Sequence, residues 1–350
     1  MSGPTPSADD ARAPLDTAAL SEYLRDRIPG FMGPVSVIRF EGGQSNPTYR
    51  LSTPGQQYAL RLKPAPAARL LPSAHAVERE FRVQSALAGS AVPVARMYCL
   101  CEDESVIGRA FYVMELIDGR IFWDKSLPGL RAAERTAIYD ELNRIIAELH
   151  RVDCAALGLA DYGVAGNYLV RQIARWTRQY RASEIAAVAA MDALIEWLPA
   201  HIPQEAEAHV SLVHGDYRLD NVIFHPTEPR ILAVIDWELS TRGHPLADFA
   251  YHLMSWYMPR GLEGLEGVEL ESLGIPAASA YIASYERRTG RSAAIDWNFY
   301  LAYNLFRMAA IVQGVVKRAD AGTASSSRAA RYASQVQPLA ELGWAFARKV

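Results

Sequence analysis

Cysteine is scarce in this chain, and its arrangement excludes two classes of protein. The 350 residues include three cysteines, Cys99, Cys101 and Cys154, and none of them forms a Cys-x-x-Cys pair. An odd number of cysteines without paired spacing fits neither a disulfide framework nor a structural zinc site. The sequence therefore predicts a protein of a reducing compartment, and we expect it to be cytoplasmic.

Long hydrophobic runs are also missing. A membrane-spanning helix needs about 20 predominantly apolar residues. The stretch 301–316 comes closest, but Asn304, Arg307 and Gln313 interrupt it. The N-terminal residues are polar and proline-rich without an apolar core, so we expect residues 1–14 to form a flexible tail and not a signal peptide. No membrane association is predicted.

A strong charge of one sign is the third absence. Lys and Arg number 36 against 39 Asp and Glu, for a formal net charge of -3. This balance argues against a broad nucleic-acid-binding surface, although a local basic groove for phosphates remains open. No Gly-x-Gly-x-x-Gly turn follows the first predicted strand, so a Rossmann dinucleotide site is unsupported.

Hydrophobic periodicity divides the remaining chain into two parts. After a helix at 15–28, residues up to 118 predict five strands and a helix at 73–87; the strands are 35–40, 49–52, 57–62, 94–100 and 109–116. Short Gly- and Pro-containing turns favour an antiparallel meander for the first three. Beyond residue 119 the chain is mostly helical, at 131–151, 167–199, 245–258, 275–289 and 296–318, with a β-rich island at 212–236. We predict an α+β bilobal fold with lobes 15–118 and 119–350.

The β-rich island contains the chemically informative residues. His214-Gly215-Asp216 is followed by Asn221, and a predicted hairpin of strands 222–224 and 231–235 then leads to Asp236. The hairpin can bring Asn221 and Asp236 together although they are far apart in sequence. This pattern therefore concentrates carboxylate and amide groups in one place.

Phosphoryl transfer explains these residue types. The reaction needs a proton acceptor beside the attacking oxygen and divalent metal on the phosphates. Asp216 is the candidate base, and Asn221 and Asp236 offer the hard oxygen ligands that Mg²⁺ prefers. Arg218 could offset charge on the transferring phosphate. The island therefore predicts a magnesium-dependent kinase.

The island resembles the catalytic and metal-binding segments of the kinase superfamily. Its His-Gly-Asp and Asp-Trp motifs are most similar to those of the aminoglycoside phosphotransferase and choline kinase-like family, which implies a protein-kinase-like fold and assigns His214 to the catalytic motif. The segment Gly243 to Asp248 matches the family's Gly-x-Pro-x-x-Asp segment, where Asp248 looks structural. ATP or GTP would be the phosphate donor.

The resemblance also implies a nucleotide site in the first lobe. Gly43, Ser45 and Asn46 would cover the phosphates, and Arg61 would contact them, with Lys63 in reserve. The helical partner of this basic residue would be Glu80, with Glu78 as the alternative. A hinge at Glu115 and Leu116 would bind the purine through its backbone.

The interval between Asp236 and Asp248 favours a small acceptor. It has no room for the activation loop and peptide-docking platform of a protein kinase. A closer resemblance, carried by HGDYRLDNVIFHP and YLAYNLFRMAAIVQGVVKR among other segments, is to kinase-like domains fused to acyl-CoA dehydrogenases and to their stand-alone bacterial relatives. It implies phosphorylation of a 4-hydroxyacyl-CoA.

Two alternatives stay open, as do the acceptor contacts. One is a kinase for aminoglycosides or other small alcohols, and the other is a catalytically silent nucleotide-binding scaffold. A strongly acidic pocket would favour aminoglycosides, but the glutamates of 263–271 fit a solvated loop. The sequence gives no indication of oligomeric state. The candidate acceptor contacts, each equally compatible with a packing role, are Arg175, Trp176, Tyr180, Trp237, Tyr300, Asn304 and Arg307.

Overall fold

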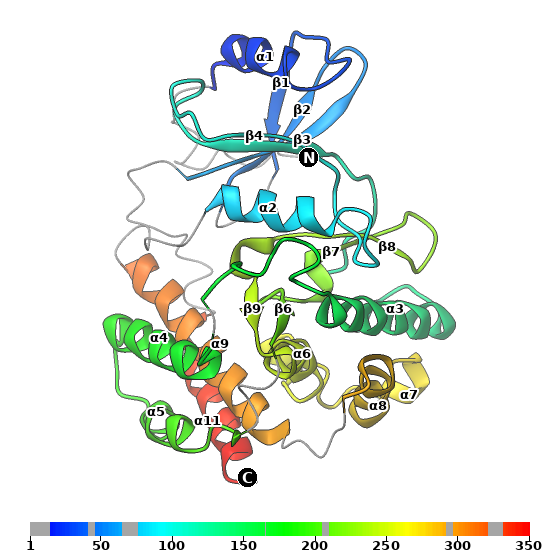
Figure 1. Cartoon of the computed structure of the whole chain (residues 1–350). Coiled ribbons are helices and arrows are strands. Elements are labelled where there is room, and N and C mark those ends of the chain that lie inside the picture. The colour runs from blue at the N-terminus through cyan, green and yellow to red at the C-terminus, as the bar shows by residue number, and fades with distance from the viewer. Residues whose placement is uncertain are drawn as a thin grey trace, which may run out of the picture. The chain divides into compact units, whose positions relative to one another are not determined.

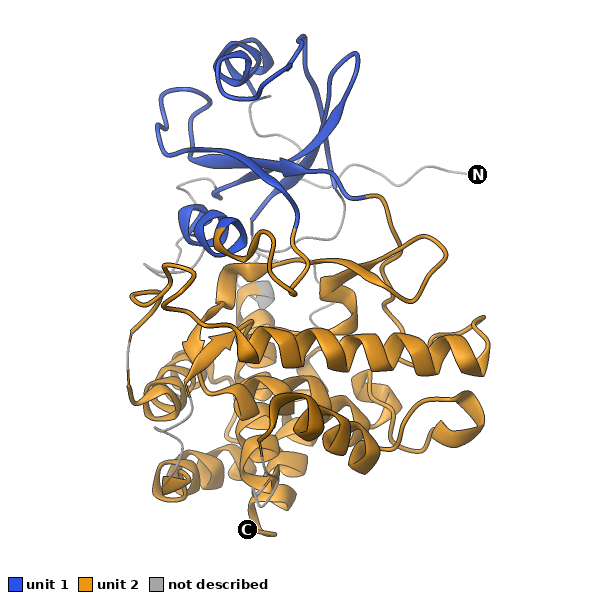
Figure 2. Cartoon of the chain, turned by 45° about the vertical axis from the view of Figure 1, so that its right-hand side comes forward, with its two compact units in different colours: residues 1–85, 95–117 blue, residues 86–94, 118–350 orange. Residues whose placement is uncertain are grey.

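The computed structural model divides the chain into two compact units (Figures 1 and 2). The first comprises residues 1–85 and 95–117, and the second comprises 86–94 and 118–350. The residues that the structure describes are 15–40, 46–64, 76–164, 166–204, 210–291, 297–320 and 332–350. The expected tail 1–14 and the predicted phosphate-covering residues Gly43 and Ser45 lie outside them.

The first unit is built on an antiparallel sheet. Its strands are β1 (Ser36–Arg39), β2 (Thr48–Ser52), β3 (Gln57–Leu62), β4 (Met97–Cys101) and β5 (Phe111–Glu115). Their order in the sheet is β1-β2-β3-β5-β4, so the first three form the predicted meander. The register places Arg61 of β3 opposite Thr48 of β2 and Tyr112 of β5, which fixes the polar neighbours of this arginine.

Two helices accompany this sheet. In α1 (Thr17–Arg25) the Asp16 carboxylate caps the first turn by accepting from the amides of residues 18 and 19. Leu20 and Leu24, four positions apart, lie on one helix face and are fully buried in a core with the sheet residue Leu60. The second helix, α2 (Val77–Leu87), carries the buried Glu80.

The second unit is mainly helical. Its α-helices are α3 (Ala132–Arg151), α4 (Tyr168–Ser183), α5 (Ala189–Ala200), α6 (Pro245–Leu253), α7 (Leu270–Leu273), α8 (Ala278–Thr289), α9 (Trp297–Asp320) and α11 (Val336–Ala347). The predicted helix 245–258 ends as α-helix at Leu253 and continues as the 3₁₀ turn Met254–Trp256. The helix α11 was not predicted from the sequence.

The prediction of one helix over 167–199 was wrong. The structure has two helices here, with α4 ending at Ser183 and α5 beginning at Ala189. The Ser183 hydroxyl donates to carbonyls of its own last turn, and its carbonyl accepts from Gln313 Nε2 of α9. No glycine or proline lies between the two helices, so the sequence carries no local signal for this break.

The helix α9 is the most apolar long helix among the described residues. By length and composition it could cross a membrane, but 83% of the relevant window is buried inside the protein. It packs against α4, α6 and α11 of the same unit. This burial is typical of a core helix.

Two small antiparallel sheets complete the second unit. One pairs β6 (Ser211–Val213) with β9 (Thr241–Gly243), and the other pairs β7 (Val222–Phe224) with β8 (Ile231–Val234). The second is the predicted hairpin. The loops that follow β6 and β8 carry Asp216 and Asp236.

Candidate active site

The loop after β6 holds Asp216 through its own neighbours. One carboxylate oxygen, Oδ2, accepts from Asn221 Nδ2 at 2.9 Å, and the same amide group donates to the Asp216 carbonyl at 2.8 Å. The other oxygen, Oδ1, lies 3.1 Å from Arg218 Nε. The side chain remains partly exposed, so a fixed carboxylate is presented by this loop.

Gly215 gives the loop a bend that other residues would resist. Its φ is +82°, in the left-handed region that glycine adopts without steric cost. A Cβ at this position would lie 2.7 Å from the carbonyl oxygen of Leu239. The middle residue of the His-Gly-Asp motif is therefore a glycine for both conformational and packing reasons.

Asp248, the fourth residue of α6, holds this loop through hydrogen bonds to the loop backbone. Its two oxygens accept from the amides of His214 at 2.9 Å and Gly215 at 2.8 Å. His150 Nε2 of α3 lies 3.1 Å from the same carboxylate, and the other ring nitrogen contacts the Tyr285 hydroxyl. Asp248 has the structural role that the family resemblance implies.

The protonation of this buried cluster follows from its contacts. Burial lowers the pKa of His150 and so favours the neutral ring. Burial opposes the Asp248 charge, but hydrogen bonds and charge from His150 and His214 outweigh it and lower the pKa of Asp248. The arrangement is a neutral histidine that donates to an ionised aspartate.

His214 requires a correction to its predicted catalytic role. The side chain is fully buried, with Nε2 at 2.9 Å from the Ile235 carbonyl and Nδ1 at 3.2 Å from the Asp216 amide. An amide N–H donates to Nδ1, so Nε2 carries the proton and donates to Ile235. Because both ring nitrogens contact backbone, His214 positions the loop and does not face a substrate.

The hairpin brings the two predicted metal ligands side by side. Val222 pairs with Val234, and the Ile235 amide donates to the Asn221 carbonyl at 2.9 Å, so Asp236 follows directly across the ladder. Asp236 itself has φ +66° and ψ +59°, a left-handed conformation that aspartate tolerates better than most residues.

This pair has the donor chemistry of a magnesium site. The Asn221 amide oxygen makes no hydrogen bond within the described part of the chain, because Nδ2 makes all the side-chain bonds. An amide oxygen and a carboxylate fit Mg²⁺, which completes its shell with waters and phosphates. Among the described residues no three His, Cys, Asp or Glu side chains form a metal cluster.

Arg218 lies among carboxylates. It contacts Asp216 and, through Nη2 at 3.1 Å, Asp220. Burial opposes its charge, but Asp216, Asp220 and Asp236 outweigh burial and raise the pKa of Arg218. The guanidinium therefore stays charged beside the candidate base. Its predicted contact with the transferring phosphate stays a prediction.

In the first unit the structure decides between the alternative ion pairs. Arg61 Nε lies 2.9 Å from Glu80 Oε2, and the Glu80 side chain is 1% exposed. Asn46 Nδ2 donates to the other Glu80 oxygen at 2.5 Å. Lys63 lies beyond the end of β3, and Glu78 is only partly buried on α2. The pair is Arg61 with Glu80.

Sequence reasoning missed the other members of this network. The Tyr112 hydroxyl donates to Glu80 Oε2 at 3.1 Å, and Gln84 Nε2 donates to the Glu80 carbonyl at 3.1 Å. Gln84 lies one helical turn after Glu80, a spacing that could have indicated it. Tyr112 has no such local signal, because only the strand register brings it opposite Arg61.

The predicted hinge lies at the end of β5. Glu115 is the last residue of the strand, and its amide donates to the Arg96 carbonyl at 2.8 Å. Its carboxylate accepts from the Arg96 amide at 3.3 Å. Leu116 follows and is partly buried. The purine contacts of both residues remain predictions.

Four of the predicted acceptor contacts are packing residues. Trp237 donates its indole N–H to the Val234 carbonyl, Asn304 donates to backbone carbonyls, and the Tyr300 ring stacks on a histidine. Tyr180 is also fully buried. These side chains are enclosed by protein and bonded or stacked within it, which favours the packing role that the sequence left open for each of them. The glutamates of 263–271 are all exposed, as a solvated loop requires.

Arg307 has a carbonyl as its partner. Its guanidinium, on α9, donates through Nη2 to the Gly215 carbonyl, directly before Asp216. Burial of a guanidinium is costly unless its N–H groups find acceptors, and this carbonyl supplies one. Arg307 therefore connects the core helix to the candidate catalytic loop.

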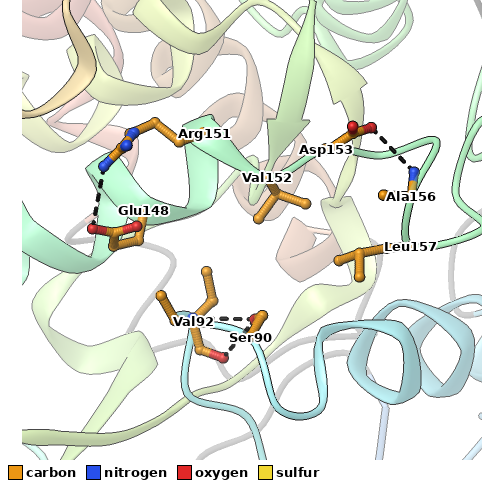
Figure 3. A pocket seen from close by; sticks show the side chains of 9 residues that line it. Ser90, Val92, Glu148, Arg151, Val152, Asp153, Ala156 and Leu157 are labelled. Atoms are coloured by element: carbon orange, nitrogen blue, oxygen red, sulfur yellow. Dashed lines mark hydrogen bonds and ion pairs between the residues drawn. The ribbon is translucent and has the colours of Figure 1, made fainter.

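A surface cavity of about 280 Å³ lies elsewhere on the second unit (Figure 3). Its polar groups bond to one another: Glu148 with Arg151 at 3.6 Å, and Asp153 with the Ala156 amide at 3.1 Å. None of the predicted site residues lines it. This cavity is thus unrelated to the candidate chemistry.

Comparison with known proteins agrees with this geometry. The model of the phosphotransferase enzyme family matches residues 36–294. Acyl-CoA dehydrogenase family member 10 of Mus musculus is 46% identical over 335 residues, which are 95% of this chain and 31% of that protein. The chain spans less than half the length of this relative.

Solved structures show the same relationship. A Ralstonia eutropha JMP134 protein, provisionally assigned as an aminoglycoside phosphotransferase, is 57% identical with a TM-score of 0.88, and the match covers 96% of this chain and 99% of that one. A thermostable variant of the aminoglycoside phosphotransferase APH(4)-Ia, in complex with AMP-PNP and hygromycin B, has a TM-score of 0.57 at 16% identity over 93% and 98% of the chains. At that identity the likeness shows the fold alone. The chain therefore belongs to the phosphotransferase enzyme family: it has the predicted protein-kinase-like fold and is a kinase that acts on hydroxyl acceptors.

Proposed function

We propose that this enzyme transfers the γ-phosphate of ATP or GTP to the hydroxyl group of a small molecule with Mg²⁺. The observation that supports this most directly is the arrangement of Asp216, Asn221 and Asp236. Asn221 bonds to the Asp216 carboxylate and lies across the hairpin ladder from the residue before Asp236. One amide side chain thus links the candidate base to the candidate metal site.

The residues have distinct roles in the proposed reaction. The acceptor oxygen forms a bond to the γ-phosphorus while the bond to the nucleoside diphosphate breaks, and the acceptor proton passes to Asp216. Asn221 and Asp236 would hold Mg²⁺, which supplies charge neutralisation on the phosphates. Arg218, charged and next to Asp216, would stabilise the phosphoryl group in transit.

In the first unit, the Arg61–Glu80 pair supports nucleotide binding. Glu80 accepts from Asn46 and Tyr112 as well, so the arginine is held in one orientation. A fixed guanidinium can pair with phosphate oxygens at little entropic cost. The AMP-PNP complex of the aminoglycoside phosphotransferase with the same fold supports a nucleoside triphosphate as donor.

The acceptor we propose is a 4-hydroxyacyl-CoA. Support comes from the likeness to acyl-CoA dehydrogenase family member 10, of which this chain matches only a part. An aminoglycoside is the second candidate, favoured by the likeness to aminoglycoside phosphotransferases. A silent nucleotide-binding scaffold is the third, and the intact Asp216, Asn221 and Asp236 speak against it.

The test is acceptor-dependent ADP or GDP release with magnesium, for native protein and Asp216→Asn. The panel contains 4-hydroxyacyl-CoAs, aminoglycosides, choline, homoserine and simple sugars. Removal of a general base should lower kcat by about 10²- to 10⁴-fold while nucleotide binding persists. Asp236→Ala should weaken Mg·nucleotide binding as well.

The matched control is Asp140→Asn, since this carboxylate lies on exposed α3 surface and pairs with Arg288. It should leave both properties unchanged. Equal transfer rates in native protein and Asp216→Asn would refute the assignment of the base. Nucleotide binding without turnover on any acceptor would favour the scaffold.

A further inference from the structure

Two arginines of the second unit carry positive charge without a carboxylate partner. Arg307 of α9 is 5% exposed, and its Nε has no hydrogen-bond partner although it is buried. Arg175 of α4 is half-buried and makes no hydrogen bond or ion pair with any other described residue, although its guanidinium lies over an aromatic ring. Burying a guanidinium without a counter-charge is costly, so both groups need an explanation.

The two guanidinium groups lie near the same aromatic side chain. Arg175 Cζ is 5.3 Å and Arg307 Cζ is 5.4 Å from the centre of the Trp176 ring, and Arg307 is also 4.6 Å from the Tyr251 ring. The rings attract the cations but leave the buried Nε–H of Arg307 without an acceptor. Burial lowers the pKa of Arg175, and repulsion by Arg307 lowers it further. An anion would relieve this repulsion.

The cluster lies next to the candidate base. Arg307 donates to the carbonyl of Gly215, and the next residue is Asp216. The Asp216 carboxylate lies closest to Asn221 and Arg218. Burial opposes the Arg307 charge, but nearby tyrosines and the charge of Asp216 raise the pKa of Arg307, although no ion pair joins Asp216 to Arg307 among the described residues. A group held by the two arginines would therefore be close to the point where the acceptor hydroxyl must reach Asp216.

We propose that Arg175 and Arg307 form an anion subsite that holds a carboxylate or phosphate group of the acceptor beside Asp216. This inference rests on the proposed kinase function and narrows its substrate class to hydroxylated anions. It disfavours aminoglycosides, because a polycation would be repelled by two arginines that lack carboxylate partners. An acyl-CoA phosphate and the carboxylate of a free hydroxy acid supply the same chemistry.

The experiment compares Arg175→Gln with Arg178→Gln, a control on the exposed surface of the same helix. The acceptors are 4-hydroxypentanoyl-CoA, free 4-hydroxypentanoate, the neutral 1,4-pentanediol and kanamycin. Loss of a charge-assisted contact should raise KM for the anionic acceptor by about 10- to 100-fold, with kcat changed far less. Arg178→Gln should change KM less than twofold. The diol should be a poor acceptor for native protein, and Arg175→Gln should not alter it.

Calorimetric titration with coenzyme A and with 4-hydroxypentanoate provides a readout independent of turnover. Weaker binding in Arg175→Gln alone supports the subsite even if no acceptor is phosphorylated, which separates this inference from the kinase proposal. Binding of coenzyme A alone identifies phosphate as the source, and binding of 4-hydroxypentanoate identifies carboxylate. Arg307→Lys, which keeps the charge, should retain more affinity than Arg307→Gln.

Three results would overturn the proposal. The first is equal behaviour of Arg175→Gln and Arg178→Gln in both assays. The second is efficient use of the diol or kanamycin by native protein. The third is a loss of Mg·ADP affinity in Arg175→Gln that matches the loss of acceptor affinity, which would assign the arginines to the nucleotide.

Discussion

Replacing Asp248 by asparagine should destabilise the second unit strongly, although the two side chains have nearly the same shape. The ionised carboxylate accepts from two backbone amides, at 2.9 Å from His214 and 2.8 Å from Gly215, and from His150 at 3.1 Å. An asparagine offers one acceptor oxygen and one NH₂ group. That NH₂ must face at least one of these donors, so a buried N–H loses its partner.

The magnitude follows from these contacts. A hydrogen bond to a charged group contributes about 1.5–3 kcal/mol, and a buried donor left without a partner costs about 1–3 kcal/mol. One weakened bond and one or two lost bonds give a destabilisation of about 3–5 kcal/mol. His150 can recover part of this by moving its proton to the other ring nitrogen, where the Tyr285 hydroxyl can accept it.

Tryptophan fluorescence during urea unfolding measures the stability of the second unit, which contains Asp248. All seven tryptophans, from Trp123 to Trp344, belong to the second unit. With a denaturant slope of about 3 kcal/mol/M, the midpoint should fall by about 1–1.7 M. The control Asp140→Asn removes an exposed ion pair to Arg288 and should cost less than about 1 kcal/mol. If both variants shift the midpoint equally, the reasoning about Asp248 is refuted.

Three further outcomes are expected. Glu80→Gln should weaken nucleotide affinity by about tenfold, because Arg61 loses its counter-charge, and isothermal titration with Mg·ADP measures this; unchanged affinity would contradict the role of the pair. Gly215→Ala should lower kcat by at least tenfold in the ADP-release assay, since its Cβ would meet the Leu239 carbonyl at 2.7 Å; full activity would show that the loop relaxes freely. Burial lowers the pKa of His252 to about 3 in the folded protein, against about 6.5 in the unfolded chain. Between about pH 3 and pH 6.5 His252 is therefore protonated in the unfolded state but not in the folded state. Stability should therefore be constant above pH 6.5 and fall below it, by about 3 kcal/mol at pH 4 from this group alone, and urea titrations that show no such decline would exclude a buried neutral His252.

The candidate site was predictable where its geometry is local. Asp216 and Asn221 belong to one loop, and the turn chemistry of the hairpin places Asp236 beside Asn221, so spacing and residue type sufficed. The partner of Arg61 required a resemblance to a family, because Glu80 lies on a different element. Tyr112 escaped prediction since strand register, which the sequence encodes only weakly, brings it to Glu80.

The fold shows the same division between local and distant causes. Strand pairing in the meander follows from short turns, and the helices of the second unit follow from apolar periodicity. At the break between α4 and α5, the Ser183 carbonyl accepts a hydrogen bond from Gln313, which is 130 positions away. His214 was misjudged for a related reason, because its motif indicates importance but not that both ring nitrogens contact backbone.

The ladder between β7 and β8 has a consequence for how this site can vary. The separation of Asn221 and Asp236 in space is set by the register of two paired strands, in which Val222 faces Val234. The number of residues in the turn that joins these strands does not affect this separation. A longer or shorter turn at 225–230 would change the sequence spacing of the two ligands and leave their geometry intact. The fifteen-residue interval is therefore a property of this chain's turn, and tolerance to insertion should be greatest there.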